Sequence, residues 1–225
     1  TEIYTLSLHD ALPIWQSIRN DLEVRPFESA TEILRAASAW GVMDCICRTQ
    51  QALIGKGCEH PVDVCMVLSA KPSAFDGNAT IRALTYDEAL HTLRRAAEAG
   101  LVHCVSNQQE ELWYLCNCCT CSCSVLRGMA ELGIANVVAH SGFVCAVDAA
   151  LCLGCGVCLD VCAFNALALT DAGVMEVRDI RCVGCGLCVS VCSQEALNLV
   201  RRAGGDEPPK DGRDWGVRRL ANRRS

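Results

Sequence analysis

Two runs of cysteines constrain the fold of this chain more than any other feature. One is CLGCGVCLDVC, starting at residue 152, and the other is CVGCGLCVSVC, starting at residue 182; both have the spacing C-x2-C-x2-C-x3-C. Three thiolates at this spacing, on a loop tightened by glycine, can wrap three corners of a cubane [4Fe–4S] cluster. The fourth corner must be bound by a cysteine from elsewhere in the chain.

A two-cluster arrangement supplies that fourth ligand by exchange, because the last cysteine of each run binds the other cluster. One predicted ligand set is Cys152, Cys155, Cys158 and Cys192. The second is Cys182, Cys185, Cys188 and Cys162. Disulfides or structural zinc would explain the runs less well, because nineteen cysteines is an odd number and zinc sites usually hold two well-separated CxxC pairs.

With these motifs, residues 143–201 resemble the bacterial-type dicluster ferredoxin domain. The resemblance implies two [4Fe–4S] clusters, and the internal repeat of about thirty residues predicts a fold of two pseudo-symmetric halves. We expect strand 143–147 to pair with strand 167–169 in the first half, and strand 174–177 to pair with 197–200 in the second. The family usually has proline after the last cysteine of a run; Ala163 and Ser193 stand there, which removes a rigid turn but no ligand.

A second group of cysteines precedes the two runs. Its densest part is CNCCTCSC at residues 116–123, where five cysteines in eight residues are too many for core filler. Adjacent thiols in a reducing cell are more often metal ligands than disulfides. The candidate ligands are Cys45, Cys47, Cys58, Cys65, Cys116, Cys118, Cys119, Cys121 and Cys123. The first four can close one site and the last five another, or the two groups can share ligands; we expect one or two further iron–sulfur clusters.

Two other residues near these cysteines, Arg48 and His60, have two interpretations each, and two further cysteines have one. Arg48 is either part of a surface ion pair or a hydrogen-bond donor to cluster sulfurs, which would raise the reduction potential. His60 is a candidate ligand, but a solvated turn before a proline is the more economical interpretation when so many cysteines are available. Cys104 and Cys145 stand alone in apolar strand-like segments, so we predict that they are structural.

The periodicity of the remaining sequence predicts a mixed α/β module over residues 27–136. A helix is predicted over 27–40 from the spacing of its apolar residues. A capping box formed by Thr85 and Glu88 predicts a second helix that runs to about residue 99. Strands are predicted at 101–105 and 112–115, and a helix follows the dense cysteine run to about residue 132. The fold class expected for the whole chain is α+β.

This module resembles the one found in a group of bacterial and archaeal iron–sulfur proteins, where it precedes a dicluster ferredoxin domain. The matching segments are CICR at 45–48, GKGCEHPVDVC at 55–65, AGLVHCVSN at 99–107 and CNCCTCSC at 116–123. Relatives commonly have a further cysteine where this chain has Ser122, so that position is not an indispensable ligand. The resemblance implies cluster binding and redox function, without naming a substrate.

The two ends of the chain differ from the rest. Residues 1–14, TEIYTLSLHDALPI, resemble a translated short-read sequencing adaptor, so we expect them to be foreign and disordered and the natural chain to extend upstream of Trp15. Residues 203–225 are expected to form a flexible basic tail. Residues 201–225 carry a formal charge of +4. Because the net charge of the whole chain is −6, the other 200 residues carry −10. An acidic body suits docking on basic redox partners and argues against nucleic acid as the main ligand.

These features favour an electron-transfer protein of a reducing, anaerobic cytoplasm, with unidentified donor and acceptor proteins. No run of eighteen or more uncharged apolar residues predicts a membrane span. Electron carriers need ligands and hydrogen-bond donors but no general acid or nucleophile, so no catalytic residue is assigned. Two alternatives stay open. One is a redox enzyme with a substrate-binding, unusual cluster at residues 116–123, and the other is a redox sensor.

Overall fold

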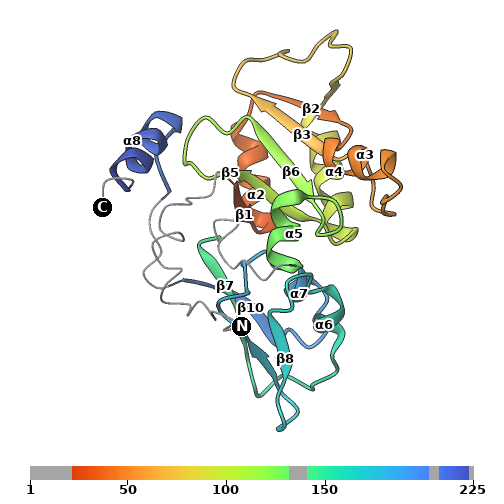
Figure 1. Cartoon of the computed structure of the whole chain (residues 1–225), viewed down its shortest axis with the longest axis vertical. Helices are drawn as coiled ribbons and strands as arrows, with labels where there is room; N and C mark the ends of the chain where they lie inside the picture. Colours follow the sequence, from red (N-terminus) through yellow and green to blue (C-terminus); the bar gives the residue numbers. More distant parts are fainter. Residues whose placement is uncertain (1–21, 132–140, 203–207, 223–225) are drawn as a thin grey trace, which may run out of the picture.

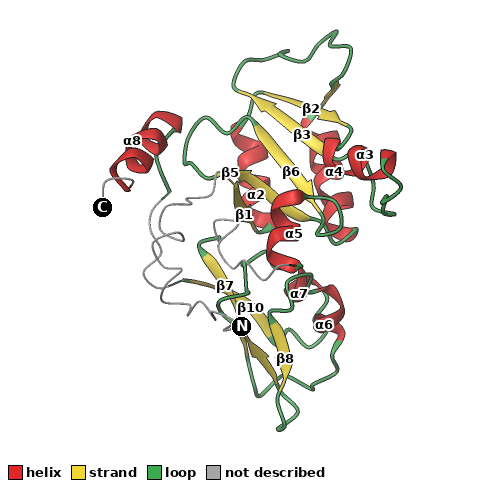
Figure 2. Ribbon diagram, in the orientation of Figure 1, coloured by secondary structure: helices red, strands yellow, loops and turns green. Residues whose placement is uncertain are grey.

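The computed structural model describes residues 22–131, 141–202 and 208–222 (Figure 1). The adaptor-like residues 1–14 lie outside the described residues, as do 203–207 of the expected tail. Two parts of the fold lie one above the other in Figure 1: a six-stranded sheet with its helices, and a smaller part built around the two cysteine runs. Mixed helix and strand content agrees with the expected α+β class (Figure 2).

The sheet of the N-terminal module is antiparallel at every pairing. Its strand order is β1-β5-β6-β3-β2-β4. The strands are β1 (Leu22–Arg25), β2 (Ala39–Met43), β3 (Cys65–Ser69), β4 (Arg82–Leu84), β5 (Val102–Ser106) and β6 (Tyr114–Cys118). Strands β5 and β6 stand close to where their sequences predicted them. The other four strands were not predicted.

Two helices cover one face of this sheet. They are α2 (Phe27–Ala36) and α4 (Tyr86–Glu98), and their apolar sides join a core cluster with Val42, Met66 and Leu115 from the strands. The predicted capping box of α4 is present, because Thr85 Oγ accepts from the backbone of Glu88 and the Glu88 carboxylate accepts from the backbone of Thr85.

The predicted helix 27–40 was too long. Helix α2 ends at Ala36, and Trp40 lies in strand β2, where it pairs with Leu68 of β3 and Leu84 of β4. Its ring Nε1 donates to the backbone oxygen of Leu34 at 2.8 Å, which fixes the strand against the end of the helix. Pairing on both sides of β2 outweighs the local helical pattern, since strand formation depends on neighbours that the sequence does not display.

The other face of the sheet carries the cysteines. Side chains alternate along a strand, so Val102 and Cys104 of β5 face away from α2 and α4, whereas Val105 faces them. The same alternation on β6 turns Cys116 and Cys118 to this second face. Helix α5 (Ser124–Ala130) packs here through Leu126 and Met129, and helix α3 (Ile46–Leu53) begins directly after Cys45.

The part around the cysteine runs contains two short helices and two pairs of strands. The helices are α6 (Val157–Val161) and α7 (Leu187–Ser190), and one lies within each run. The strands are β7 (Phe143–Val147), β8 (Leu167–Leu169), β9 (Met175–Val177) and β10 (Leu197–Arg201). Their positions were predicted well, but the predicted pairing was wrong: β7 pairs with β10 and β8 pairs with β9. Each sheet therefore joins the two halves: β8 and β9 form a hairpin through the turn at 170–174, whereas β7 pairs with β10 from the far end of the domain.

Helix α8 (Gly212–Asn222) lies within the segment 203–225 that was expected to be a flexible basic tail. The carboxylate of Asp211 starts it by accepting from the backbone N–H groups of Arg213 and Asp214. Just before the helix, the backbone oxygens of Pro209 and Lys210 accept from the loop that joins β5 to β6. The described helices include none with the length and apolarity needed to cross a bilayer.

Candidate metal centres

The first cysteine run lines a cavity. Three of its cysteines are joined there by the last cysteine of the second run: the thiols are Cys152, Cys155, Cys158 and Cys192. The rest of the lining is largely apolar, with Met175 and Leu197 among it. The structure therefore brings together the first predicted ligand set.

The second run lines a matching cavity, again joined by the last cysteine of the other run. The predicted thiols here are Cys162, Cys182, Cys185 and Cys188. A fifth, Cys145, also lines this cavity, with its Sγ 3.6 Å from that of Cys188. Cys145 is buried as a structural cysteine would be, but its place beside the ligand set was not predicted.

Backbone N–H groups point at the sulfurs of both cavities. Met175 donates to Cys152 Sγ at 3.4 Å and Cys145 donates to Cys182 Sγ at 3.5 Å. Ala166 donates to Cys162 Sγ at 3.3 Å. Such donors stabilise thiolates that bind a cluster and raise its reduction potential. Four convergent thiols, a largely apolar lining and aimed N–H groups fit a [4Fe–4S] cluster in each cavity.

Glycines shape the loops that wrap these cavities. Gly154 and Gly184 have φ values of +65° and +70°, a region in which other residues are strained. A Cβ atom would also meet the backbone oxygen of Gly173 at the first position and that of Phe143 at the second. Each loop therefore needs glycine to turn closely against a neighbouring strand end.

Residues 151–196 match the family model of the 4Fe-4S dicluster domain. No curated protein matches the chain. The match covers both cavities and identifies this part as an iron–sulfur-binding domain of ferredoxin type. The chain is therefore an iron–sulfur protein. The N-terminal module lies outside the matched residues, so its chemistry has to be read from its own side chains.

Six of the nine N-terminal cysteines gather in one place, which we call the thiol ring. Neighbours in the ring perturb each other's pKa through thiol–thiolate hydrogen bonding. In order around the ring they are Cys45, Cys47, Cys123, Cys118, Cys116 and Cys65, and Cys65 returns to Cys45. The structure thus brings together thiols from both of the groups that the sequence analysis distinguished.

Hydrogen bonding between neighbouring thiols lowers the pKa of three of the ring cysteines and raises that of the other three. Hydrogen bonds from Cys47 and Cys65 lower the pKa of Cys45 to about 2. Hydrogen bonds from Cys118, with Cys65 and Cys47 respectively, lower the pKa of Cys116 to about 4 and that of Cys123 to about 3. The pKa values of Cys47, Cys65 and Cys118 are raised in return, and a hydrogen bond with Cys104, outside the ring, contributes most to the raised pKa of Cys118. Six soft sulfur ligands packed this closely repel one another as thiolates unless a metal neutralises them.

The other three N-terminal cysteines form a second group with a histidine. The ligand atoms of Cys58, His60, Cys119 and Cys121 all lie within 4.8 Å of one another. Cys58 Sγ lies 3.9 Å from Cys119 Sγ, and Cys121 Sγ lies 3.7 Å from His60 Nδ1. His60 lies half-buried in the bend before Pro61, as the solvated-turn interpretation expected, and the three thiols lie beside it. Burial opposes ionisation of Cys58, but hydrogen bonds with Ser122 and His60 lower its pKa to about 6.

Arg48 lies between the thiol ring and this second group. Its side chain is 2% exposed, which rules out the surface ion pair. Both terminal nitrogens donate to the backbone oxygen of Asn117, at 3.1 and 3.0 Å, and Nη1 lies 3.6 Å from Cys119 Sγ. The guanidinium is placed to offset the negative charge of thiolates on both sides.

Asn117 holds the dense cysteine run in position, and the sequence analysis missed it. Its side chain is fully buried; Nδ2 donates to the backbone oxygen of Val64 at 2.6 Å, and Oδ1 lies 2.6 Å from His103 Nδ1. Burial lowers the pKa of His103, so the neutral ring donates to Asn117. An asparagine in a strand is uncommon, and its place among ligands was the signal that could have pointed to this role.

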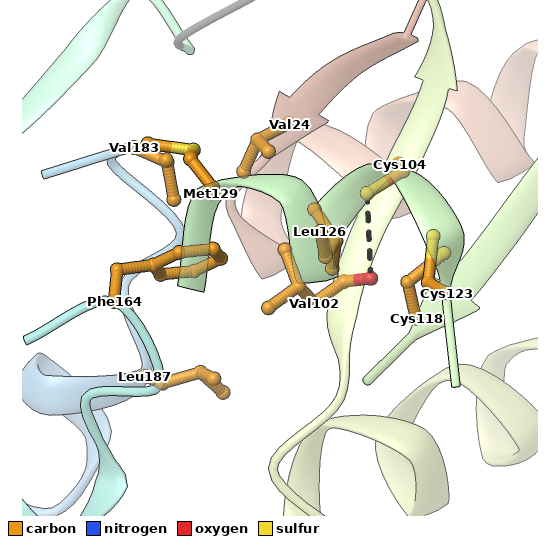
Figure 3. Packing of buried hydrophobic residues seen from close by; sticks show 10 residues of the cluster. All are labelled: Val24, Val102, Cys104, Cys118, Cys123, Leu126, Met129, Phe164, Val183 and Leu187. Carbon is orange, nitrogen blue, oxygen red and sulfur yellow. Dashed lines mark hydrogen bonds between the residues drawn. The ribbon is translucent and has the colours of Figure 1, made fainter. Parts of the chain in front are cut away.

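One apolar cluster joins the thiol ring to the second cavity (Figure 3). From the module it contains Cys118 and Cys123 of the ring, with Leu126 and Met129 of α5. From the dicluster domain it contains Phe164, Val183 and Leu187, which face α5 in Figure 3. Cys104 is buried in the same cluster, where its Sγ donates to Val102 O at 3.7 Å. Cys162 and Cys185 of the second cavity pack against this cluster. Its apolar side chains therefore lie between these two cysteines and the thiol ring, where they exclude water.

Proposed function

We propose that this chain is an electron-transfer protein in which the dicluster domain and the N-terminal module form one path for electrons. The observation that carries the proposal is the apolar cluster that joins the thiol ring to the second cavity. Clusters bound at such sites supply carriers of single electrons. The two sets of four thiols in a pseudo-symmetric dicluster domain would hold one [4Fe–4S] cluster each, and the ring would hold a further iron–sulfur centre.

The roles of the protein's own residues follow from this arrangement. The cysteines bind iron, and the backbone N–H groups of Met175, Cys145 and Ala166 stabilise the ligated sulfurs. Val183 and Leu187 keep water out of the contact between the two parts. Cys155 is exposed, so the first cavity opens towards solvent, where a redox partner protein could exchange electrons.

The test is a count of centres followed by a measurement of electron flow. Anoxically purified chain should contain about eight iron atoms for the dicluster domain and additional iron for the ring. Cys118→Ser should remove only the additional iron and its EPR signal. The photoreduced chain should then pass electrons to a one-electron acceptor such as a cytochrome. A chain with no EPR-active centre, or one that transfers no electron, would refute the proposal.

A redox enzyme is the second candidate, and one observation favours it. The ring has six thiols, whereas a cubane takes four. An unusual cluster could use the two additional thiols as ligands and still have a coordination position for a small molecule. Addition of cyanide or carbon monoxide separates the two candidates: a changed EPR signal from the ring alone favours the enzyme, and an unchanged signal favours the carrier.

A further inference from the structure

We propose that Cys58, His60, Cys119 and Cys121 bind one zinc ion in a closed, structural site that is separate from every iron–sulfur centre. The first argument is the size of the group. Zn–S bonds of about 2.3 Å and Zn–N bonds of about 2.0–2.1 Å, arranged as a tetrahedron, put sulfurs about 3.8 Å apart and sulfur about 3.6 Å from nitrogen. The observed separations are 3.9 Å between Cys58 and Cys119 and 3.7 Å between Cys121 and His60.

A cubane does not fit these separations. It binds each thiolate on a different iron atom at a different corner, so its ligand sulfurs stand farther apart than the edges of a single-ion tetrahedron. Here all four ligand atoms are within 4.8 Å of one another. Three cysteines and one histidine also form one of the usual ligand sets of structural zinc.

The chain separates this site from the thiol ring. Strand β6 ends at Cys118, and the turn after it directs Cys119 and Cys121 away from the ring. Cys119 packs in a different core cluster, with Val64 and Leu101. The next cysteine, Cys123, returns to the ring. Successive thiols of one short segment therefore serve two sites.

The surroundings suit the charge of the ion and its ligands. Three thiolates and one Zn²⁺ carry a net charge of −1 when the histidine is neutral. The buried guanidinium of Arg48, with Nη1 3.6 Å from Cys119 Sγ, offsets that charge. Ser122 Oγ lies 3.4 Å from Cys58 Sγ and donates to it once the thiolate is formed. Such outer contacts orient ligands and tune metal affinity.

The site would fasten the first half of a loop whose last residues, 62–64, are already held by hydrogen bonds from Cys45, Arg95 and Asn117. Cys58 and His60 lie between α3 and β3, in a segment without a helix or strand, and Cys119 and Cys121 follow β6. That loop leads from Cys45 and Cys47 to Cys65, three members of the thiol ring. A zinc ion that ties this loop to the turn after β6 restricts the conformations of the loop. The free energy of metal binding then contributes to the free energy of folding.

The test uses the full chain, purified without oxygen, with zinc, iron and sulfide measured on the same sample. We expect about one zinc per chain, and X-ray absorption at the zinc edge should show three sulfur ligands and one nitrogen ligand. His60→Ala and Cys121→Ser should each reduce zinc at least tenfold while iron, sulfide and EPR signals stay unchanged. His91→Ala, on the exposed side of α4, is the matched control and should retain its zinc.

Three outcomes would overturn the proposal. Loss of iron and sulfide in both variants would mean that the four side chains bind an iron–sulfur cluster. Zinc that persists in both variants would lie elsewhere. A mononuclear ferric thiolate signal in place of zinc would assign the site to iron. Failure of electron transfer with zinc intact would refute the proposed function alone, so the two proposals are tested separately.

Discussion

The two cavities of the dicluster domain have the same construction but opposite surroundings. In each, three thiols of one run meet the last thiol of the other, and a backbone N–H from a neighbouring strand donates to the first cysteine. The loops differ in exposure at equivalent positions. Leu153 is 71% exposed and Val183 is 1% exposed; Val157 is 48% exposed and Leu187 is 9% exposed.

This difference shows that the repeated motif supplies the ligands, while the neighbours of each copy decide what that copy can do. The first cavity faces solvent because nothing in the described chain covers Leu153 or Val157. The second is covered by α5 of the N-terminal module, through Leu126 and Met129. An exposed centre exchanges electrons with other proteins more readily, and a covered one exchanges them within the chain. We therefore expect the first cavity to be the external contact.

The largest effect is expected from the exchanged ligands. Cys162→Ser should remove the cluster of the second cavity, about four iron atoms, because Cys162 lies with Cys182, Cys185 and Cys188. The EPR spectrum that remains should equal that of Cys185→Ser.

The matched variant is Cys192→Ser, which should lose the other cluster and give the spectrum of Cys155→Ser. If Cys162→Ser instead reproduced the spectrum of Cys155→Ser, each run would bind its own cluster. The comparison between the cavities would then need a different ligand assignment.

Opposite exposure should appear as opposite tolerance to a charge. Val183→Asp puts an unpaired carboxylate into the apolar cluster between the two parts, which should lower the free energy of unfolding by about 3–5 kcal/mol. Leu153→Asp, at the equivalent exposed position, should change it by less than about 0.5 kcal/mol. Anoxic denaturant titrations followed by circular dichroism measure both. Equal losses would mean that the first cavity is also covered.

Common construction predicts equal sensitivity at the two wrapping glycines. Gly154→Ala and Gly184→Ala each place a Cβ against a backbone oxygen at positive φ, so each should cost about 1–3 kcal/mol and loosen cluster binding. Gly142→Ala is the control, because its Cβ would meet no atom within 4 Å. The measurement is iron retained after mild chelation. A large loss in only one of the two variants would show that the loops are not equivalent.

The parts of the fold that could be predicted from the sequence are those that depend on residues close together in the chain. The capping box at Thr85 and the strands of the dicluster domain depend on near neighbours and were predicted. The pairing of β7 with β10 was not, because it is decided by the way the two halves meet.

The same reason explains the N-terminal module. Spacing identified nine candidate cysteines, but it could not say that six face one another across β3, β6 and two helix starts while three turn towards His60. Arg48 and Asn117 illustrate the limit well. Both are polar residues in segments that offer no local reason for burial, and only the assembled sheet brings Val64, Asn117 and Arg48 into one hydrogen-bonded group.

The smallest effect is expected from the C-terminal segment, since none of its described residues, 208–222, lines either cavity. Its described contacts are with the β5–β6 loop: Gln109 and Glu110 donate backbone hydrogen bonds to Pro209 and Lys210, and Lys210 Nζ lies 3.8 Å from Glu110. That ion pair is more than half exposed on both sides, and exposed pairs contribute at most about 1 kcal/mol.

Truncation after Arg202 should therefore leave iron content unchanged and both EPR signals in place. Only binding to acidic partners should weaken. The difference in binding between the full and the truncated chain should become smaller as salt rises, because added ions screen the positive charges that only the full chain carries. Iron analysis and binding measurements at two salt concentrations test this directly. Iron loss from one cavity alone would show that the segment contributes to the difference between the cavities, and α5 would then not be its sole cause.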